Sequence, residues 1–420
     1  MDAQPTRYRG FWLDRAGKVA LPLLAGVVAW LIPLLYHGGW PHGGMADFDI
    51  YVQGARTALH GGELYRDGPD AFVYPPVAAL LFLPFTWGPV IVWKILWAVA
   101  GWFGIMAVVH RMGLRSWSAS VVSAAAIGTC TPVTLGTELG QIQLILTCLV
   151  VLDLVPGPHL LGRRLPIPDG WLLGLMTAIK LTPGLFIVHL LVNRRWKQAI
   201  SASVSALGFT LVGLAVYPHQ SIFYWKRLLA TGSVGFESDP IYLDNQSFEG
   251  ATLRVFKLDA VGSELGTVLS ALTILIGLAA AWALLRRKLE APAVAVIGIA
   301  TALASPVSWT HHYVWIVPLA VALVSHRPTR PVGFTGALLI VWVWLAPYRT
   351  LPSGGMVEMA YTPAQAALSA VTPVLGLLLL LASLLAGFRH LPHRSDLPHR
   401  PDLPERPVPA GQEQIGADRT

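Results

Sequence analysis

Two aspartates in a long polar segment are the first residues whose chemistry suggests a reaction. Asp47 and Asp49 lie in residues 44–74, between apolar stretches. A carboxylate next to a hydroxyl group can remove its proton as a general base. An apolar stripe at helical spacing predicts an amphipathic helix over residues 49–60, lying at the outer membrane interface. Asp47 then sits at or just before the start of this helix, where it either caps the first free amides or acts as the base.

Polar side chains also interrupt the apolar segments, where they are costly and therefore indicate function. Lys180 and the pair His311 and His312 can donate hydrogen bonds to a phosphate. Neighbouring residues on a helix point about 100° apart. The histidine pair is therefore a poor metal site, and we expect one imidazole to face a cavity and the other to pack. The alternative for Lys180 is snorkelling to the membrane surface. Gln141 and Gln143 are the other polar candidates.

A second long polar segment, residues 218–264, mixes aromatic side chains with amides and carboxylates. It contains Tyr224 and Trp225, and Asn245 and Gln246 follow them. Such a mixture suits sugar rings, which offer an apolar face and a rim of hydroxyl groups. An aromatic belt at the membrane interface has the same composition, so both interpretations stand.

The composition indicates that membrane-spanning helices hold these residues in place. Of 420 residues, 54% are hydrophobic and only 13% are charged, against roughly 25% charged in soluble domains. This excludes a disordered chain, and the two cysteines, Cys130 and Cys148, are too few for a disulfide scaffold and are expected in the core. The net charge of +7 does not indicate nucleic-acid binding, because the basic residues form short clusters at the ends of apolar segments. We therefore predict an all-α polytopic integral membrane protein.

The basic clusters predict the topology, since Lys and Arg concentrate on the cytoplasmic side. We expect residues 1–16 to be a cytoplasmic N-terminus and residues 17–389 to be a multi-span domain with external loops 37–74 and 218–264. Residues 390–420 are expected to be a disordered cytoplasmic tail. The clusters that set this orientation are Arg194/Arg195/Lys197, Arg286/Arg287/Lys288, Arg327/Arg330 and the basic residues of 389–394.

One part of the charge pattern leaves two alternatives. Arg163/Arg164 and Arg194/Arg195 both favour the cytoplasm, although only one apolar run separates them. Either this run forms two short helices broken at residues 180–183, or one cluster is external. We expect about 12 spans, within a range of about 11 to 13.

Several motifs, taken in order and spacing over residues 40–325, resemble those of glycosyltransferase family 87. These enzymes are actinobacterial mannosyltransferases of the GT-C class that use polyprenol-phosphate mannose. The nearest functional type is the α-1,2-mannosyltransferases that act on phosphatidylinositol mannosides or lipomannan. The motifs are Asp47-Phe-Asp-Ile-Tyr51, Leu64-Tyr65, Phe72-Val-Tyr-Pro-Pro76, Gly140-Gln-Ile-Gln143, Lys180-Leu-Thr-Pro183, Arg194-Arg-Trp196 and Ser305-Pro-Val-Ser-Trp-Thr-His-His312.

The resemblance implies a GT-C-like bundle with interfacial helices in its external loops, located in the plasma membrane with the active site facing the periplasm. It implies inverting transfer of mannose from polyprenyl-phosphate mannose to a phosphatidylinositol mannoside or lipomannan. Membrane lipids are further expected partners, and nucleic acid is not. Asp47 would be the base, with Asp49 as the alternative. The leaving phosphate would be bound by His311, His312 or Lys180, and the sugar or acceptor positioned by Gln141, Gln143, Asn245, Gln246, Tyr51, Tyr74 and Trp309.

No cofactor and no metal are expected. Asp47-Phe-Asp49 imitates the Asp-x-Asp that holds a divalent ion with a nucleotide sugar. A lipid-phosphate donor has no pyrophosphate to chelate, and carboxylates two residues apart on a helix diverge.

Two other functions remain as alternatives. A transporter or flippase for glycolipids or polyprenyl phosphates would also place polar residues in its spans. The chain shows no internal hydropathy repeat of the kind common in transporters, and its two long loops are expected on one side, which favours an enzyme. The second alternative is a transferase of another polyprenyl-phosphate sugar, such as arabinose.

Overall fold

The computed structural model describes residues 5–36, 44–66, 71–157, 166–231, 234 and 240–389. Helices account for most of these residues. Their only strand-like pairing is an isolated antiparallel bridge between Asn245 and Trp309. This confirms the all-α class expected from the apolar segments. The predicted tail, 390–420, lies outside the described residues, as do residues 1–4 of the predicted N-terminal segment.

The long helices support a multi-pass membrane protein. Five single helices are long and apolar enough to cross a membrane, and two bent pairs of helices could each form one more span. The pairs are α5 (Ser116–Thr129) with α6 (Thr131–Leu139), bent by 62°, and α17 (Pro363–Ser369) with α18 (Val371–Arg389), bent by 46°. The described residues therefore give five to seven spans by length and composition, and the expected number of about 12 stays a prediction. The five single helices are α1 (Pro5–Tyr36), α4 (Val90–Arg111), α10 (Trp196–Val216), α13 (Ala260–Arg286) and α16 (Arg330–Leu345).

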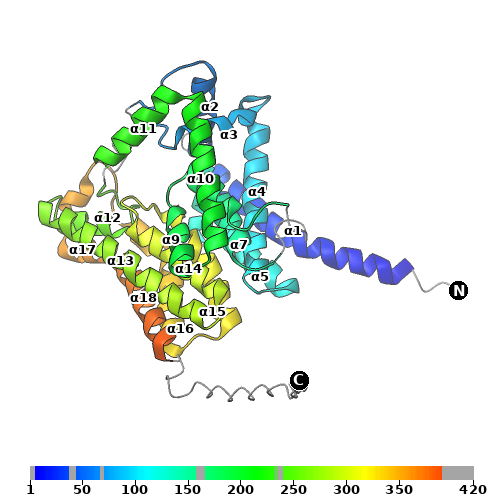
Figure 1. The fold of residues 1–420 in the computed structure, drawn as a ribbon. Coiled ribbons are helices and arrows are strands. Elements are labelled where there is room, and N and C mark those ends of the chain that lie inside the picture. Colours follow the sequence, from blue (N-terminus) through cyan, green and yellow to red (C-terminus); the bar gives the residue numbers. More distant parts are fainter. Residues whose placement is uncertain are drawn as a thin grey trace, which may run out of the picture.

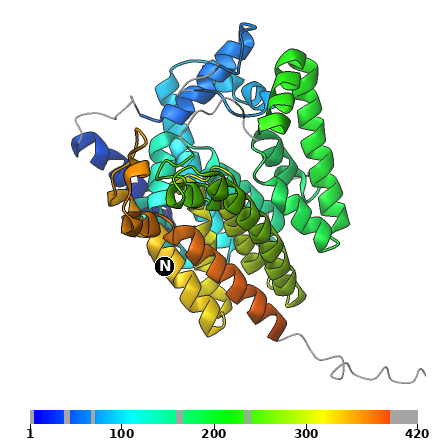
Figure 2. The same ribbon diagram turned by 90° about the vertical axis from the view of Figure 1, so that its left-hand side faces the viewer.

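Shorter helices gather at one end of this bundle. In Figure 1, α2 (Ala46–Leu59), α3 (Pro76–Leu81) and α11 (Pro218–Thr231) lie at the top, while α16 and α18 reach the bottom. Figure 2, a view at right angles, shows α10 and α11 in green beside the bundle formed by the yellow-green to orange helices. Both polar segments singled out in the sequence thus contain helices: α2 in the first, and α11 and α12 (Phe248–Val255) in the second.

Another set of helices is apolar but too short to cross a membrane alone. At about 1.5 Å per residue, the nine residues of α8 or α9 extend only about 14 Å, about half of a hydrocarbon layer roughly 30 Å thick. These helices are α7 (Gln143–Leu154), α8 (Trp171–Ile179), α9 (Gly184–Val192), α14 (Glu290–Ala304) and α15 (Ile316–His326). The segments that join them, including 180–183 and 305–312, are therefore expected to lie below the membrane surface.

The helices α8 and α9 form a pair that turns back on itself. Gly170, just before α8, lies so close to the start of α10 that a Cβ atom there would be 2.3 Å from the carbonyl oxygen of Gln198. Because α9 ends at Val192, only four residues before α10 begins, the pair starts and finishes at the same end of the bundle. The predicted break at residues 180–183 is confirmed and forms the tip of this pair. Of the two flanking basic clusters, Arg194/Arg195 follows α9 at this end, whereas Arg163/Arg164 lies outside the described residues.

Helix α14 forms the centre of the bundle. Eleven of its 15 residues are buried, and it contacts α13, α15 and α18. Small side chains allow helices to approach this closely in a membrane. At Gly298 a Cβ atom would lie 2.2 Å from the indole of Trp315. The Ala- and Gly-rich sequence of α14 is thus the reason that its neighbours, and the segment 305–312 that follows it, are held firmly.

The first interfacial helix begins earlier than the sequence predicts. Helix α2 starts at Ala46, and Met45 occupies the N-cap position in a left-handed conformation, with φ at 55° and no side-chain cap. Asp47 is therefore in the first turn of the helix, and its interpretation as an N-cap is wrong. Its carboxylate still benefits from the positive end of the helix dipole.

Candidate active site

Seven of the predicted side chains line one cavity of about 280 Å³. It lies where the start of α2, the turn between α6 and α7, the α8–α9 tip and segment 305–312 meet, with α11 closing one side. Residues separated by up to 265 positions in sequence are thereby brought together. The seven are Asp47, Tyr51, Tyr74, Gln141, Lys180, Trp309 and His312.

A chain of hydrogen bonds holds the carboxylate on one wall of the cavity. The side-chain amide of Gln141 donates to Oδ2 of Asp47 at 2.6 Å. The hydroxyl of Tyr51 donates to Oε1 of Gln141 at 3.4 Å and lies 3.1 Å from the hydroxyl of Tyr74. The backbone N–H of Ile142 also donates to the Tyr51 hydroxyl, at 3.2 Å. Asp47 and Tyr51 are four residues apart and so share one face of α2.

Gly140 brings the two halves of this wall together. It ends α6 with a φ of 70°, and a Cβ atom on it would lie 2.7 Å from Cβ of Phe48 and 2.9 Å from Cβ of Met45. The backbone N–H of Met45 donates to the carbonyl of Glu138 at 3.0 Å, and the indole of Trp97 donates to the carbonyl of Gly140 at 2.9 Å. The start of α2 thus rests on the α6–α7 turn, which places Gln141 against Asp47.

The two tyrosine hydroxyls stay protonated in this environment. Burial raises the pKa of Tyr51 well above its usual range, and the neighbouring Tyr74 and Asp47 raise it further. Burial, followed by the charge of Asp47, also raises the pKa of Tyr74. Both residues therefore act as neutral hydrogen-bonding groups that orient Gln141 and, through it, the carboxylate.

Lys180 and His312 form a nitrogen-rich patch on another wall. Nζ of Lys180 lies 3.0 Å from Nε2 of His312 and 5.9 Å from the ring centroid of Tyr74. The backbone N–H of Trp309 donates to Nδ1 of His312 at 3.2 Å. Nδ1 therefore provides the lone pair, and the proton of a neutral imidazole is on Nε2. A protonated Lys180 and this Nε2–H are both donors, so at 3.0 Å from one another they repel unless an acceptor adjoins both. An anionic oxygen lying beside the pair and accepting from both nitrogens would supply that acceptor.

The two histidines lie in different environments, as expected. The two rings are 4.6 Å apart and nearly perpendicular, at 86°. His312 lines the cavity, whereas His311 is buried away from it, and its Nε2 has no hydrogen-bond partner among the described residues. The prediction that one imidazole faces a cavity while the other packs is confirmed.

Asp49 points away from the cavity. Its Oδ2 forms an ion pair with Nζ of Lys94 at 2.7 Å, and the same ammonium group donates to the carbonyl of Gly44 at 2.7 Å. Asp49 and Asp47 therefore diverge, as expected for carboxylates two residues apart on a helix. The described residues contain no group of three His, Cys, Asp or Glu side chains close enough to hold a metal ion.

Three predicted positioning residues do not line the main cavity. Gln143 lines a small adjoining space behind His312. The amide of Asn245 donates to the carbonyls of Pro240 and Pro306, and its oxygen accepts the N–H groups of Ser247 and Ser308. Gln246 is fully buried and donates to the carbonyl of Leu243. The structure thus gives Asn245 a supporting role for segment 305–309 instead of the sugar contact that we expected.

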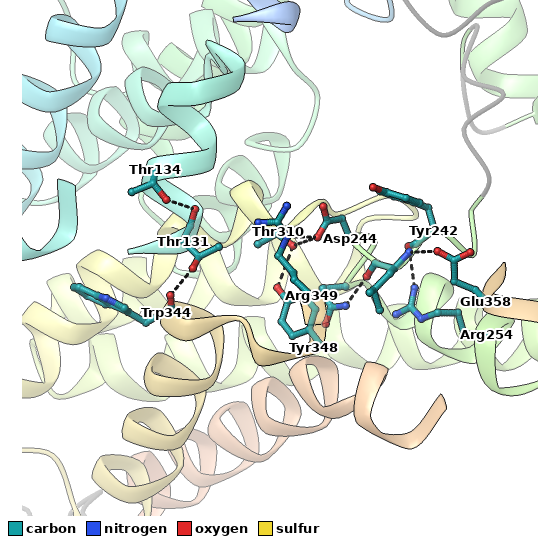
Figure 3. A network of polar contacts seen from close by, with 12 residues as sticks. Thr131, Thr134, Tyr242, Asp244, Arg254, Thr310, Trp344, Tyr348, Arg349 and Glu358 are labelled. Atoms are coloured by element: carbon teal, nitrogen blue, oxygen red, sulfur yellow. Dashed lines mark hydrogen bonds and ion pairs between the residues drawn. The ribbon is translucent and has the colours of Figure 1, made fainter. Parts of the chain in front are cut away.

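A buried arginine supports this wall from behind (Figure 3). Arg254 is fully buried and donates to the carbonyls of Tyr242 and Asn245 and to the hydroxyl of Ser369. In the same network Asp244 accepts from the hydroxyl of Thr310 at 2.8 Å and from Arg349 at 3.1 Å. The network therefore ties residues 240–254 and the C-terminal region to the segment that carries Trp309 and His312.

The sequence reasoning missed Arg254 and Lys94. Lys94 had a visible signal, because it is a lysine in an otherwise apolar segment. Arg254 lies in a polar segment where an arginine is unremarkable, and only the tertiary structure shows its burial.

Comparisons with known proteins identify relatives of this chain. Residues 72–306 match the model of glycosyltransferase family 87. The polyprenol-phosphate-mannose-dependent α-(1-2)-phosphatidylinositol mannoside mannosyltransferase of Mycolicibacterium smegmatis is 31% identical, over 70% of this chain and 74% of the relative. The protein of the same name from Mycobacterium tuberculosis is also 31% identical, over 76% of this chain and 80% of the relative.

A relative from M. tuberculosis named for a phosphatidylinositol pentamannoside is 32% identical, over 71% of this chain and 70% of the relative. No solved structure matches the chain. The matches make this protein a glycosyltransferase with a helical membrane fold. The chain belongs to glycosyltransferase family 87.

Proposed function

We propose that this glycosyltransferase moves mannose from polyprenyl-phosphate mannose to a hydroxyl group of a phosphatidylinositol mannoside or lipomannan, forming an α-1,2 linkage on the periplasmic side. The observation that carries the proposal is the placement of a carboxylate and a pair of nitrogen donors in one cavity. The names of the mycobacterial relatives support the donor, the acceptor and the linkage.

Asp47 is the general base of the proposed reaction. As the acceptor oxygen attacks the anomeric carbon, Asp47 takes the hydroxyl proton, and the bond between that carbon and the phosphate oxygen breaks. The departing phosphate keeps the electron pair. Because the acceptor attacks the face of the anomeric carbon opposite to the phosphate, a β-linked donor gives an α-linked product. The bond from Gln141, whose side-chain oxygen in turn accepts from Tyr51, fixes the carboxylate in one orientation. A base positioned in this way contributes about 10²- to 10⁴-fold in rate.

Lys180 and His312 stabilise the phosphate as it leaves. Negative charge develops on the oxygen that the sugar departs from, and donors already aimed at that oxygen lower the barrier. The backbone N–H of Trp309 holds His312 in the tautomer that presents Nε2–H to the cavity. The ammonium group of Lys180 supplies the compensating charge.

The proposed reaction needs no metal ion. The second carboxylate of the Asp-x-Asp sequence is paired with Lys94 and does not line the cavity, so the two aspartates do not form a chelate. We expect transfer to survive EDTA, and a loss that added Mg²⁺ or Mn²⁺ restores would contradict this part of the proposal.

The test is a transfer assay in membranes that contain the full chain. Radiolabelled polyprenyl-phosphate mannose is supplied with phosphatidylinositol mannosides, and the labelled product is measured. Asp47→Asn keeps the shape of the side chain but removes the base, and we expect its rate to fall at least about 100-fold. Asp49→Asn is the matched control, because it makes the same change two residues away, and we expect a rate within about threefold of wild type.

The outcomes separate the alternatives. Full activity of Asp47→Asn would remove the assigned base. Transfer from polyprenyl-phosphate arabinose but not from the mannose donor would replace the sugar and keep the mechanism. Movement of an intact labelled lipid across the membrane without a new glycosidic bond would favour a flippase instead.

A further inference from the structure

A second opening lies at the end of the bundle away from the active-site cavity. It has a volume of about 130 Å³ and is formed where α13 passes into α14, α15 passes into α16, and α18 nears its end. Segment 305–312 follows the opposite end of α14 and precedes α15, so this opening is separate from the cavity that contains Asp47. The proposed transfer reaction does not use it.

The walls of the opening are apolar, and basic side chains line it. Leu319, Leu323 and Val332 are among the apolar residues, and Arg287 and Arg327 provide the positive charge. Neither arginine is ion-paired with a carboxylate in the described part of the chain. Two cations thus adjoin an apolar space without a negative partner there.

Buried hydroxyl groups add hydrogen-bonding capacity. Ser383 is 1% exposed, and its Oγ has no hydrogen-bond partner among the described residues. The buried Oγ1 of Thr329 also has no hydrogen-bond partner there. Both residues line the opening. A buried hydroxyl without a partner is unfavourable, so a ligand whose oxygen acceptors reach these groups stabilises this site.

We propose that this opening binds an anionic phospholipid. Its phosphate is held by Arg287 and Arg327, and part of an acyl chain lies against the apolar walls. Basic pockets between membrane-spanning helices bind acidic lipid head groups in this way. The combination decides the ligand, because a free phosphate ion would leave the apolar walls unused and a neutral lipid would leave both arginines uncompensated.

The experiment measures lipid retained by the full-length protein after purification from membranes containing both phosphatidylglycerol and phosphatidylcholine. Native mass spectrometry counts bound lipids, and melting temperatures are compared in nanodiscs of either lipid. We expect wild type to retain phosphatidylglycerol preferentially and to melt at a higher temperature in it. Inorganic phosphate alone should not reproduce the shift in melting temperature.

Matched variants test the assignment. Arg287→Gln/Arg327→Gln removes both charges from the opening, and we expect at least about tenfold less retained phosphatidylglycerol. Lys288→Gln/Arg330→Gln removes two nearby charges from residues that do not line the opening, and should retain lipid as wild type does. Ser383→Leu keeps every charge and fills the space, so it should also lose the lipid.

Equal retention by the two double variants would overturn the proposal, because the binding would then reflect surface charge alone. A wild-type protein without anionic lipid would overturn it as well. Unchanged mannosyl transfer by the variants in detergent would show that they are folded. Since transfer activity is measured separately, failure of the lipid proposal and failure of the proposed function are distinguishable.

Discussion

At the scale of single residues, the cavity gives adjacent histidines different tasks. His312 faces the cavity between Lys180 and Trp309, while His311 is buried behind it. We expect His312→Ala to reduce kcat about 100-fold or more, since it removes a donor that acts on charge developing in the transition state. His311→Ala should change kcat much less and should lower the melting temperature, because it empties a buried site.

The measurement is steady-state transfer with the labelled donor, together with thermal unfolding of both purified variants. Equal losses of kcat with equal melting temperatures would contradict the division of roles between the two histidines.

The buried tyrosines next to Asp47 allow a prediction about how transfer activity depends on pH. The pKa of Tyr74 is raised by burial and by Asp47, so its hydroxyl stays protonated at and above its usual titration range near pH 10. Tyr74→Phe should lower transfer by about two- to tenfold through the lost hydrogen bond. It should leave the shape of the activity profile between about pH 6 and 9 unchanged, and the full profile of both proteins checks this. An alkaline limb that disappears in the variant would show that Tyr74 ionises in the functional range.

At the scale of elements, the contact between α2 and the α6–α7 turn decides whether the carboxylate is aligned. In Gly140→Ala the new methyl group meets the side chains of Phe48 and Met45 at less than 3 Å, in a backbone conformation that already disfavours side chains. We expect a large loss of activity together with reduced thermal stability.

Gly61→Ala is a control, because it also places a side chain on a residue with a left-handed backbone conformation. Gly61 also has a positive φ, of 69°, but no atom lies within 4 Å of the position that its new methyl group would take. This variant should therefore lose about 1–2 kcal/mol of stability and keep its activity. If both variants behave alike, backbone strain explains the effect and the contact with α2 does not matter.

The sequence located the reactive residues better than the elements that position them. Lys180 and His312 stand out because polar groups in apolar surroundings need a reason. Asp47 stands out as a carboxylate at the start of a predicted interfacial helix, and all three residues line the cavity. The start of α2 could not be predicted, since Met45 is not a capping residue and its left-handed conformation depends on contact with a distant turn.

The supporting role of Asn245 could not be predicted from the sequence either. Amides suit sugar hydroxyls and backbone groups equally well, and only the fold shows that four backbone groups already occupy this side chain. The number of spans is hard to read from the sequence for a related reason. Helices such as α8 and α9 are apolar, yet too short to cross, and an apolar run in a sequence does not reveal where the chain turns back.

At the scale of the whole molecule, the two ends of the bundle should lie on opposite sides of the membrane. Cys130 and Cys148 are buried, so the wild-type chain gives little background with thiol reagents. His60 is exposed after α2, and Lys288 is exposed between α13 and α14. We expect a membrane-impermeant maleimide to label His60→Cys in intact cells and Lys288→Cys only after permeabilisation.

Labelling of Lys288→Cys in intact cells would reverse the proposed orientation. Labelling of both positions would mean that the apolar helices do not separate the two ends.

The depth of the α8–α9 tip also affects what happens after the glycosidic bond has formed. A polyprenyl phosphosugar is a phosphodiester with one negative charge, whereas the spent carrier is a phosphomonoester that can take on a second, since its second pKa is near about 6. One partly buried ammonium group, that of Lys180, matches the first charge and leaves the second without a counterion in surroundings of low polarity. We therefore expect the spent carrier to be bound less tightly than the donor it came from. Its second ionisation would drive it toward the head-group region, which would allow product to exchange for fresh donor.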